Sequence, residues 1–179
     1  MNRFLVVLLL GFILIGGVLM LNYQEARISG TAGTPENGVD GTGETAGTSE
    51  REVLGVQEGR PYSSAVKVIR APQGEGGGAT LYVSGQVGID IGIGEKVDGD
   101  ITAETRQVLY NLKGIVESAG FQMSDVVMCT VYLLDMDDYT AVNQAYMEFF
   151  PGDPPARACV GVNQLVGDYR IEISLVAEK

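Results

Sequence analysis

The chain has 179 residues and a formal net charge of −11. It contains no histidine and only two cysteines, Cys129 and Cys159, which excludes His-based nucleophile triads, His-ligated zinc and a disulfide framework. Residues 51–179 hold 10 basic and 18 acidic residues, a net charge of −8. An acidic domain repels a phosphate backbone, so we expect no nucleic-acid partner.

Residues 1–21 are predicted to form an N-terminal transmembrane anchor. Residues 4–21 carry no charge, and as a helix they would reach ~27 Å, enough to cross a bilayer core. A cleaved signal is the alternative, but its apolar run is usually about 7–15 residues followed by small residues, which are lacking here. Arg3 precedes the run, whereas Arg27 beyond it is offset by Glu25. The positive-inside rule therefore favours a domain outside the cytoplasm, with the cytoplasmic face as the alternative.

Residues 22–52 are predicted to be a flexible tether, and residues 53–179 a single globular domain. Gly, Thr and Glu dominate residues 29–50, where Val39 is the only β-branched aliphatic side chain. Such a segment buries too little apolar surface to offset the entropy of ordering it.

The hydrophobic pattern of the domain predicts two strands, a helix, a strand, a helix and two strands. Thr102 is the expected cap of the first helix and Gly120 its end. This ββαβαββ order indicates an α/β sandwich with two helices on one sheet face, and self-association would cover the other. The elements are expected at 65–69, 79–87, 102–119, 126–134, 138–150, 156–162 and 169–177.

Arg157 and Glu172 are the first candidate site residues, because each lies in a strand pattern of alternating polarity. If the last two strands form a hairpin centred in residues 163–168, Arg157 lies opposite Ser174 and diagonal to Glu172 on one face. One interpretation is a cross-strand salt bridge. The other is a guanidinium that binds a substrate carboxylate, with a glutamate beside it to orient or deprotonate water.

The cysteines and glycine-rich segments favour structural roles. Cys129 lies within an apolar strand and is expected in the core, and for Cys159 packing is favoured over nucleophilic chemistry. The segments around 74–78 and 85–92 lack the residues of phosphate-binding loops and are interpreted as turns.

A collinear series of short motifs closely resembles the RidA/YjgF family of enamine/imine deaminases over about residues 59–177. Its most specific part is Pro-Ala-Arg-Ala-Cys-Val at 155–160, followed by Glu172 fifteen residues after Arg157. The other matching segments are 60–66, 81–86, 99–101, 105–109, 111–113, 119–120, 125–127, 130–133, 135–136, 141–143 and 171–173.

The resemblance implies a chorismate-mutase-like fold with a mixed sheet, assembled as a homotrimer with ligand clefts between subunits. By family analogy Arg157 binds the carboxylate of a short 2-imino or 2-enamino acid, Glu172 positions the attacking water, and Cys159 lies near the reacting nitrogen. The implied reaction is hydrolysis of 2-iminopropanoate or 2-iminobutanoate to the 2-oxo acid and ammonia, without a metal or organic cofactor. The residues implied to line the cleft are Tyr62, Ser84 and Asn143.

The sequence also departs from the family pattern. Gly88 stands where the family usually has proline, and Gly161 where it usually has glutamate. The anchor and tether are foreign to the common soluble form, and reactive enamines arise mainly in the cytoplasm. A membrane-tethered module that binds small carboxylates without turnover therefore stays open as the alternative. Endoribonuclease activity, attached to some relatives, is disfavoured by the acidic domain.

Overall fold

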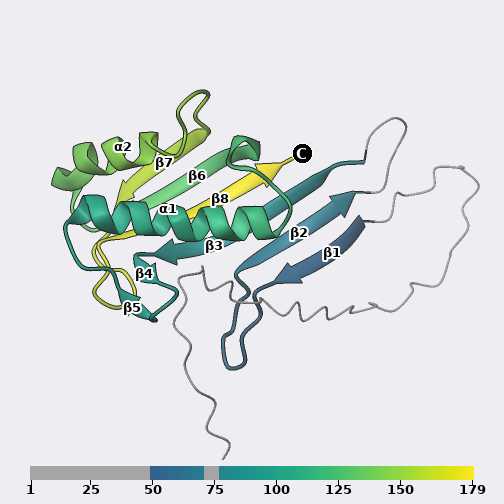
Figure 1. The fold of residues 1–179 in the computed structure, drawn as a ribbon, viewed down its shortest axis with the longest axis horizontal. Coiled ribbons are helices and arrows are strands. Elements are labelled where there is room, and N and C mark those ends of the chain that lie inside the picture. Colours follow the sequence, from purple (N-terminus) through teal and green to yellow (C-terminus); the bar gives the residue numbers. More distant parts are fainter. Residues whose placement is uncertain (1–48, 71–76) are drawn as a thin grey trace, which may run out of the picture.

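The computed structural model describes residues 49–70 and 77–179 (Figure 1). The predicted anchor and most of the predicted tether lie outside these residues. Strand β1 begins at Ser49, so residues 49–52, which were expected in the tether, belong to the sheet. Within the described part of the chain, no helix is both long and apolar enough to cross a membrane.

Six strands form one mixed sheet in the order β1-β2-β3-β8-β6-β7, and β4 and β5 form a small hairpin beside it. Neighbours in the large sheet are antiparallel except β6 and β7, which are parallel. The predicted mixed sheet is thus confirmed. The strands are β1 (Ser49–Leu54), β2 (Ala65–Arg70), β3 (Ala79–Val87), β4 (Ile89–Asp90), β5 (Glu95–Lys96), β6 (Val126–Leu133), β7 (Ala156–Gly161) and β8 (Ile171–Glu178).

Helix α1 (Ile101–Ser118) begins one residue earlier than predicted, and its cap differs. The carboxylate of Asp100 accepts a hydrogen bond from Ala103 N at 2.9 Å, so Asp100, in extended backbone, is the N-cap in place of Thr102. Gly120 follows the helix with φ +81°, as expected of a glycine that ends a helix.

Helix α2 (Tyr139–Met147) is shorter than predicted at both ends. A 3₁₀ turn, Met136–Asp138, leads into it. At its other end the amide of Phe149 donates to the carbonyl of Tyr146, a tight turn that ends the regular helix before Pro151.

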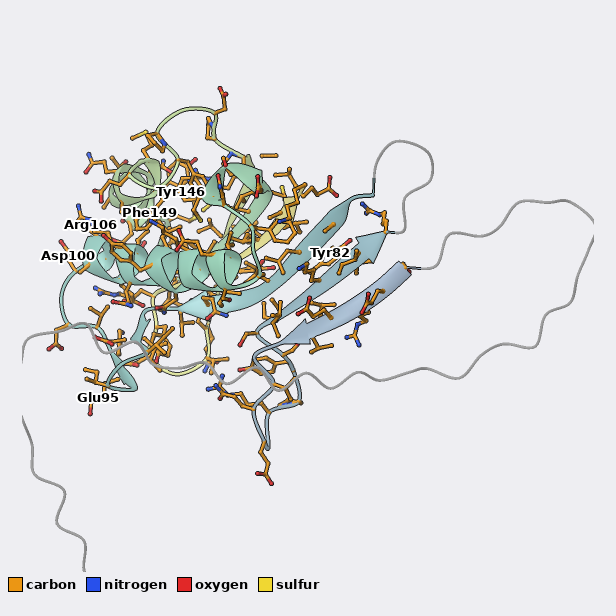
Figure 2. The ribbon with its side chains drawn as sticks, turned by 45° about the vertical axis from the view of Figure 1, so that its right-hand side comes forward. Tyr82, Glu95, Asp100, Arg106, Tyr146 and Phe149 are labelled. Atoms are coloured by element: carbon orange, nitrogen blue, oxygen red, sulfur yellow. The ribbon has the colours of Figure 1, made fainter. Side chains whose placement is uncertain are left out.

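Both helices cover the same face of the sheet, and the core lies between them and that face (Figure 1). Leu109 and Leu112 of α1 and Ile171 and Ile173 of β8 are fully buried there. The opposite face has no covering layer among the described residues, and Tyr82 and Val160 on it are 49% and 44% exposed. Figure 2 shows Tyr82 on β3, away from Tyr146 and Phe149 in the helical layer. The predicted ββαβαββ sandwich is confirmed, with β1 and the β4–β5 hairpin added.

Candidate active site

Arg157 lies on β7, the edge strand, on the helix-covered side of the sheet. It pairs with Cys129 of β6, and directly paired residues on neighbouring strands point to the same face. Its Nη2 donates to Asn143 Oδ1 at 2.7 Å and to Tyr139 Oη at 3.2 Å. The guanidinium carbon lies 4.7 Å from the ring centroid of Tyr146, a cation–π distance. Helix α2 therefore holds the guanidinium through three side chains.

Glu172 lies on β8, on the uncovered side of the sheet. It pairs with Tyr132 of β6 and Val87 of β3. Its carboxylate lies against Gly85, where an added Cβ would overlap Oε1 and stand 2.7 Å from Cδ. The β3–β8 register shifts between Val83 and Gln86, so Gly85 lies in a bulge. The bulge and the missing side chain give the carboxylate its space.

Ser84 lies in the same bulge, next to Gly85. Its hydroxyl donates to the carbonyl of Ser63 at 2.8 Å, and its amide donates to the carbonyl of Ser64 at 3.0 Å. These bonds tie the bulge to the connection between β1 and β2. Tyr62 precedes Ser63 in that connection and is 57% exposed. Ser84, Glu172 and the Tyr62 segment thus belong to one end of the sheet.

The predicted hairpin between the last two strands is wrong. β6 lies between β7 and β8, and β7 is parallel to β6. Residues 162–170 are long enough to pass over one strand, whereas the prediction assumed the shortest connection. Because Arg157 pairs with Cys129 and Glu172 with Tyr132, the two side chains project from opposite faces of one chain's sheet. Within 49–70 and 77–179 they form no salt bridge, so that interpretation is wrong as well.

Cys159 lies two residues after Arg157 and projects from the same face. Burial raises the pKa of its thiol, and the Arg157 guanidinium offsets this only in part. The thiol is therefore neutral near pH 7 and can serve as a weak hydrogen-bonding group, not as a thiolate nucleophile.

Tyr139 and Tyr146 are contacts of Arg157 that the sequence analysis missed. They lie at positions −4 and +3 relative to Asn143, which is the spacing of one helix face. Tyr146 is 4% exposed, and its hydroxyl has no hydrogen-bond partner among the described residues. Burial, and then the adjacent Cys129 thiol, raise the pKa of Tyr146, so the phenol stays neutral. The sequence signal for these two tyrosines is that they share a helix face with Asn143. A helix face that packs on the core explains the same spacing, so the signal did not single them out.

A second polar cluster anchors the start of β8. The carboxylate of Glu104 is fully buried and accepts from both the amide and Nε of Arg170, each at 2.7 Å. Lys96 Nζ lies 3.7 Å from the same carboxylate. Since Arg170 precedes Ile171 and Glu172, this cluster fixes the backbone that carries Glu172. In the part of the chain that the structure describes, no three His, Cys, Asp or Glu side chains are grouped to hold a metal ion.

The fold defines an α+β protein of chorismate-mutase-like architecture. Residues 56–179 match the family described as Endoribonuclease L-PSP, and the chain belongs to this family, also known as RidA/YjgF. The chain is 48% identical to a RutC family protein of Sulfurisphaera tokodaii, an alignment that covers 66% of this chain and 88% of that protein. It is 42% identical to a mouse protein named 2-iminobutanoate/2-iminopropanoate deaminase, covering 65% of this chain and 80% of that one.

Two solved structures are similar to this chain in sequence and in fold. A putative endoribonuclease of Thermotoga maritima is 40% identical with a TM-score of 0.59, covering 69% of this chain and 90% of that chain. The yjgF gene product of E. coli is 34% identical with a TM-score of 0.57, covering 70% and 91%.

Proposed function

We propose that this protein hydrolyses short 2-imino or 2-enamino acids, such as 2-iminopropanoate and 2-iminobutanoate, to 2-oxo acids and ammonia. One observation carries the proposal. The Arg157 guanidinium is held on one side by Asn143 and Tyr146, while its Nε and Nη1 make no hydrogen bond within the described residues. A held guanidinium with unused donors is suited to a carboxylate. The name of the mouse relative supports this choice of substrate.

The proposed chemistry needs little beyond positioning. Water adds to the imine carbon, the C–N bond breaks, and nitrogen leaves as ammonia. Glu172 accepts a proton from the attacking water and returns it to the leaving nitrogen. A protonated imine is already electrophilic, so holding it beside water supplies most of the acceleration. No metal or organic cofactor enters this scheme.

The two halves of the proposed site come from different copies of the chain. Arg157 with Asn143 projects from the helix-covered face, and Glu172 with Ser84 from the uncovered face, so one chain does not bring them together. We infer that the edge strand β7 of one subunit lies against the uncovered face of the next. A homotrimer closes such a head-to-tail arrangement and covers the exposed side chains on that face.

The test is an assay of the purified full-length chain. An amino acid oxidase generates the imine in place, and release of 2-oxo acid is timed with and without the protein. Arg157→Ala should abolish the acceleration, and Arg157→Lys should restore little because the compact ammonium of lysine cannot donate to Asn143 and to the substrate with the fixed planar geometry of a guanidinium. The matched control is Arg106→Ala, which removes an exposed arginine paired with Glu148 and should keep full activity.

Two outcomes contradict the proposal. Near-full activity of Arg157→Lys would exclude a need for the planar guanidinium in binding the carboxylate. No acceleration by the wild-type chain, together with measurable binding of 2-oxobutanoate, would instead favour the membrane-tethered binding module.

A further inference from the structure

The hydroxyl of Tyr139 is a polar group at the Arg157 site that the proposed chemistry has not used. Tyr139 is the first residue of α2, and its side chain is 39% exposed, whereas Tyr146 on the same helix face is 4% exposed. Its oxygen accepts the 3.2 Å hydrogen bond from Arg157 Nη2. The group thus lies at the open side of the guanidinium.

A tyrosine hydroxyl is one donor as well as an acceptor. Since the Tyr139 oxygen accepts from Arg157, its own proton remains for another partner, and the hydroxyl donates to no acceptor within 49–70 and 77–179. Accepting from a cation also polarises the O–H bond and strengthens it as a donor. A polarised donor without an acceptor in this part of the chain therefore lies against Nη2 of a guanidinium whose other two nitrogens are unused.

Holding Arg157 in place does not account for this hydroxyl. Asn143 Oδ1 makes the shorter bond to the same nitrogen, 2.7 Å against 3.2 Å, and Tyr146 lies under the guanidinium at 4.7 Å. The ring of Tyr139 is farther from the guanidinium carbon, at 5.7 Å. The contacts with Asn143 and Tyr146 suffice to orient the guanidinium, and Tyr139 adds a weaker one.

We propose that Tyr139 Oη is a second carboxylate-binding donor of this site. One carboxylate oxygen accepts from the guanidinium of Arg157, and the other accepts from the Tyr139 hydroxyl. The hydroxyl lies 3.2 Å from Nη2, the nitrogen that shares the guanidinium plane with the unused Nε and Nη1, so a carboxylate oxygen held by either of those nitrogens lies near the hydroxyl. This inference rests on the proposed function, because it concerns the same 2-imino and 2-oxo acid ligands.

The test measures binding of 2-oxobutanoate to the full-length protein by titration calorimetry, alongside turnover. Tyr139→Phe keeps the ring and removes only the hydroxyl, and it should weaken binding about tenfold, the worth of one good hydrogen bond. KM for 2-iminobutanoate should rise by a similar factor, with a smaller change in kcat. The matched control is Tyr110→Phe, which removes a hydroxyl from an exposed tyrosine of α1 that packs on Phe149 and should change neither quantity.

A second variant separates donation from positioning. Fluorotyrosine at position 139, studied below neutral pH so that the phenol stays protonated, is a better donor and a poorer acceptor than tyrosine. If the hydroxyl donates to the carboxylate, this replacement should bind 2-oxobutanoate at least as tightly as wild type. If the hydroxyl only accepts from Arg157, the replacement should weaken binding, and the proposal is overturned.

The remaining outcomes are also decisive. Binding by Tyr139→Phe within twofold of wild type, with the wild type turning over imines, would overturn the role of Tyr139 and leave the proposed function standing. A wild-type chain that neither binds 2-oxobutanoate nor accelerates hydrolysis would overturn the proposed function, and this inference with it.

Discussion

At the scale of single residues, two cysteines on neighbouring strands differ in how deeply they are buried. Cys129 is fully buried beside Tyr146, and burial raises its pKa. Cys159 is only partly buried, and its raised pKa is reduced in part by the Arg157 guanidinium. The more accessible Cys159 can therefore report on the charge of Arg157.

We predict that iodoacetamide modifies Cys159 slowly at pH 7. The rate should keep rising at pH values above the pKa of an ordinary thiol. A raised pKa means a smaller thiolate fraction at every pH below it, and the thiolate is the reactive form. Arg157→Ala removes the charge that lowers this pKa, so it should slow the modification further. The rate is followed by mass spectrometry of the native protein.

The matched control for this measurement is Cys159→Ser, which should remain unmodified while folded because Cys129 is fully buried. Fast modification of the wild type at pH 7 would mean that Cys159 is a thiolate. It would then be a candidate nucleophile, contrary to the packing role expected from its apolar neighbours.

Single site residues could be predicted where a family motif contains them, and not where burial or a capping preference explains the residue equally well. The resemblance indicated Asn143, and the structure gives it a hydrogen bond to Arg157 at 2.7 Å. Tyr139 and Tyr146 were missed because an aromatic side chain on a helix is explained by burial alone. Thr102 was taken as the helix cap because it is a good capping residue, but Asp100 is one as well and has the extended backbone that a cap needs.

At the scale of elements, the bulge of β3 is the local irregularity that gives Glu172 its space. Alternation in residues 171–175 correctly predicted which of them share a face, because that depends on local geometry alone, whereas Arg170 precedes β8 and bonds Glu104 of α1. It said nothing of which strand lies beside β8. Strand order follows from pairing between segments far apart in the chain, and this is why the hairpin prediction failed while the strands themselves were found.

We predict that Gly85→Ala lowers turnover strongly while leaving the free energy of unfolding within about 1 kcal/mol of wild type. The added Cβ would overlap the Glu172 carboxylate, and a flexible side-chain end can swing away without moving the backbone. The carboxylate is displaced and the fold is kept. Urea unfolding and the imine assay measure the two effects.

Gly114→Ala is the matched control. Gly114 lies within α1 with no atom near its added Cβ, so alanine there should keep activity and stabilise the helix by up to about 1 kcal/mol. A Gly85→Ala variant with full activity would show that the position of the Glu172 carboxylate against the bulge is not needed for turnover.

At the scale of the whole molecule, the two faces of the sheet differ in what covers them, and the proposed assembly has to cover the second face. One face packs on the helices, and the other presents Tyr82, Val160 and the carboxylate of Glu172 without a covering layer among the described residues. Arg157 lies at the edge strand and on the opposite face. Membrane attachment through residues 1–21 stays a prediction from the sequence, because these residues lie outside the described part of the chain.

We predict that two inactive variants restore activity when they are mixed. If the protein is the proposed homotrimer, Arg157→Ala and Glu172→Gln should each disable every site in their own assembly. If a site takes Arg157 from one subunit and Glu172 from the next, random 1:1 mixed trimers hold roughly one quarter intact sites. Co-expression of the two variants should therefore recover about that share of wild-type activity, and sedimentation equilibrium should give a trimer.

The controls for this test are the two variants purified separately and then mixed without subunit exchange, which should stay inactive. A double variant carrying both substitutions is co-expressed with wild type as a second control. It measures the activity that remains when wild-type chains are diluted by inactive ones. No recovery on co-expression, with mixed trimers verified by differential tags, would mean that Arg157 and Glu172 do not act in one shared site. Since their side chains leave one sheet from opposite faces, the proposed roles of the two residues would then be incompatible.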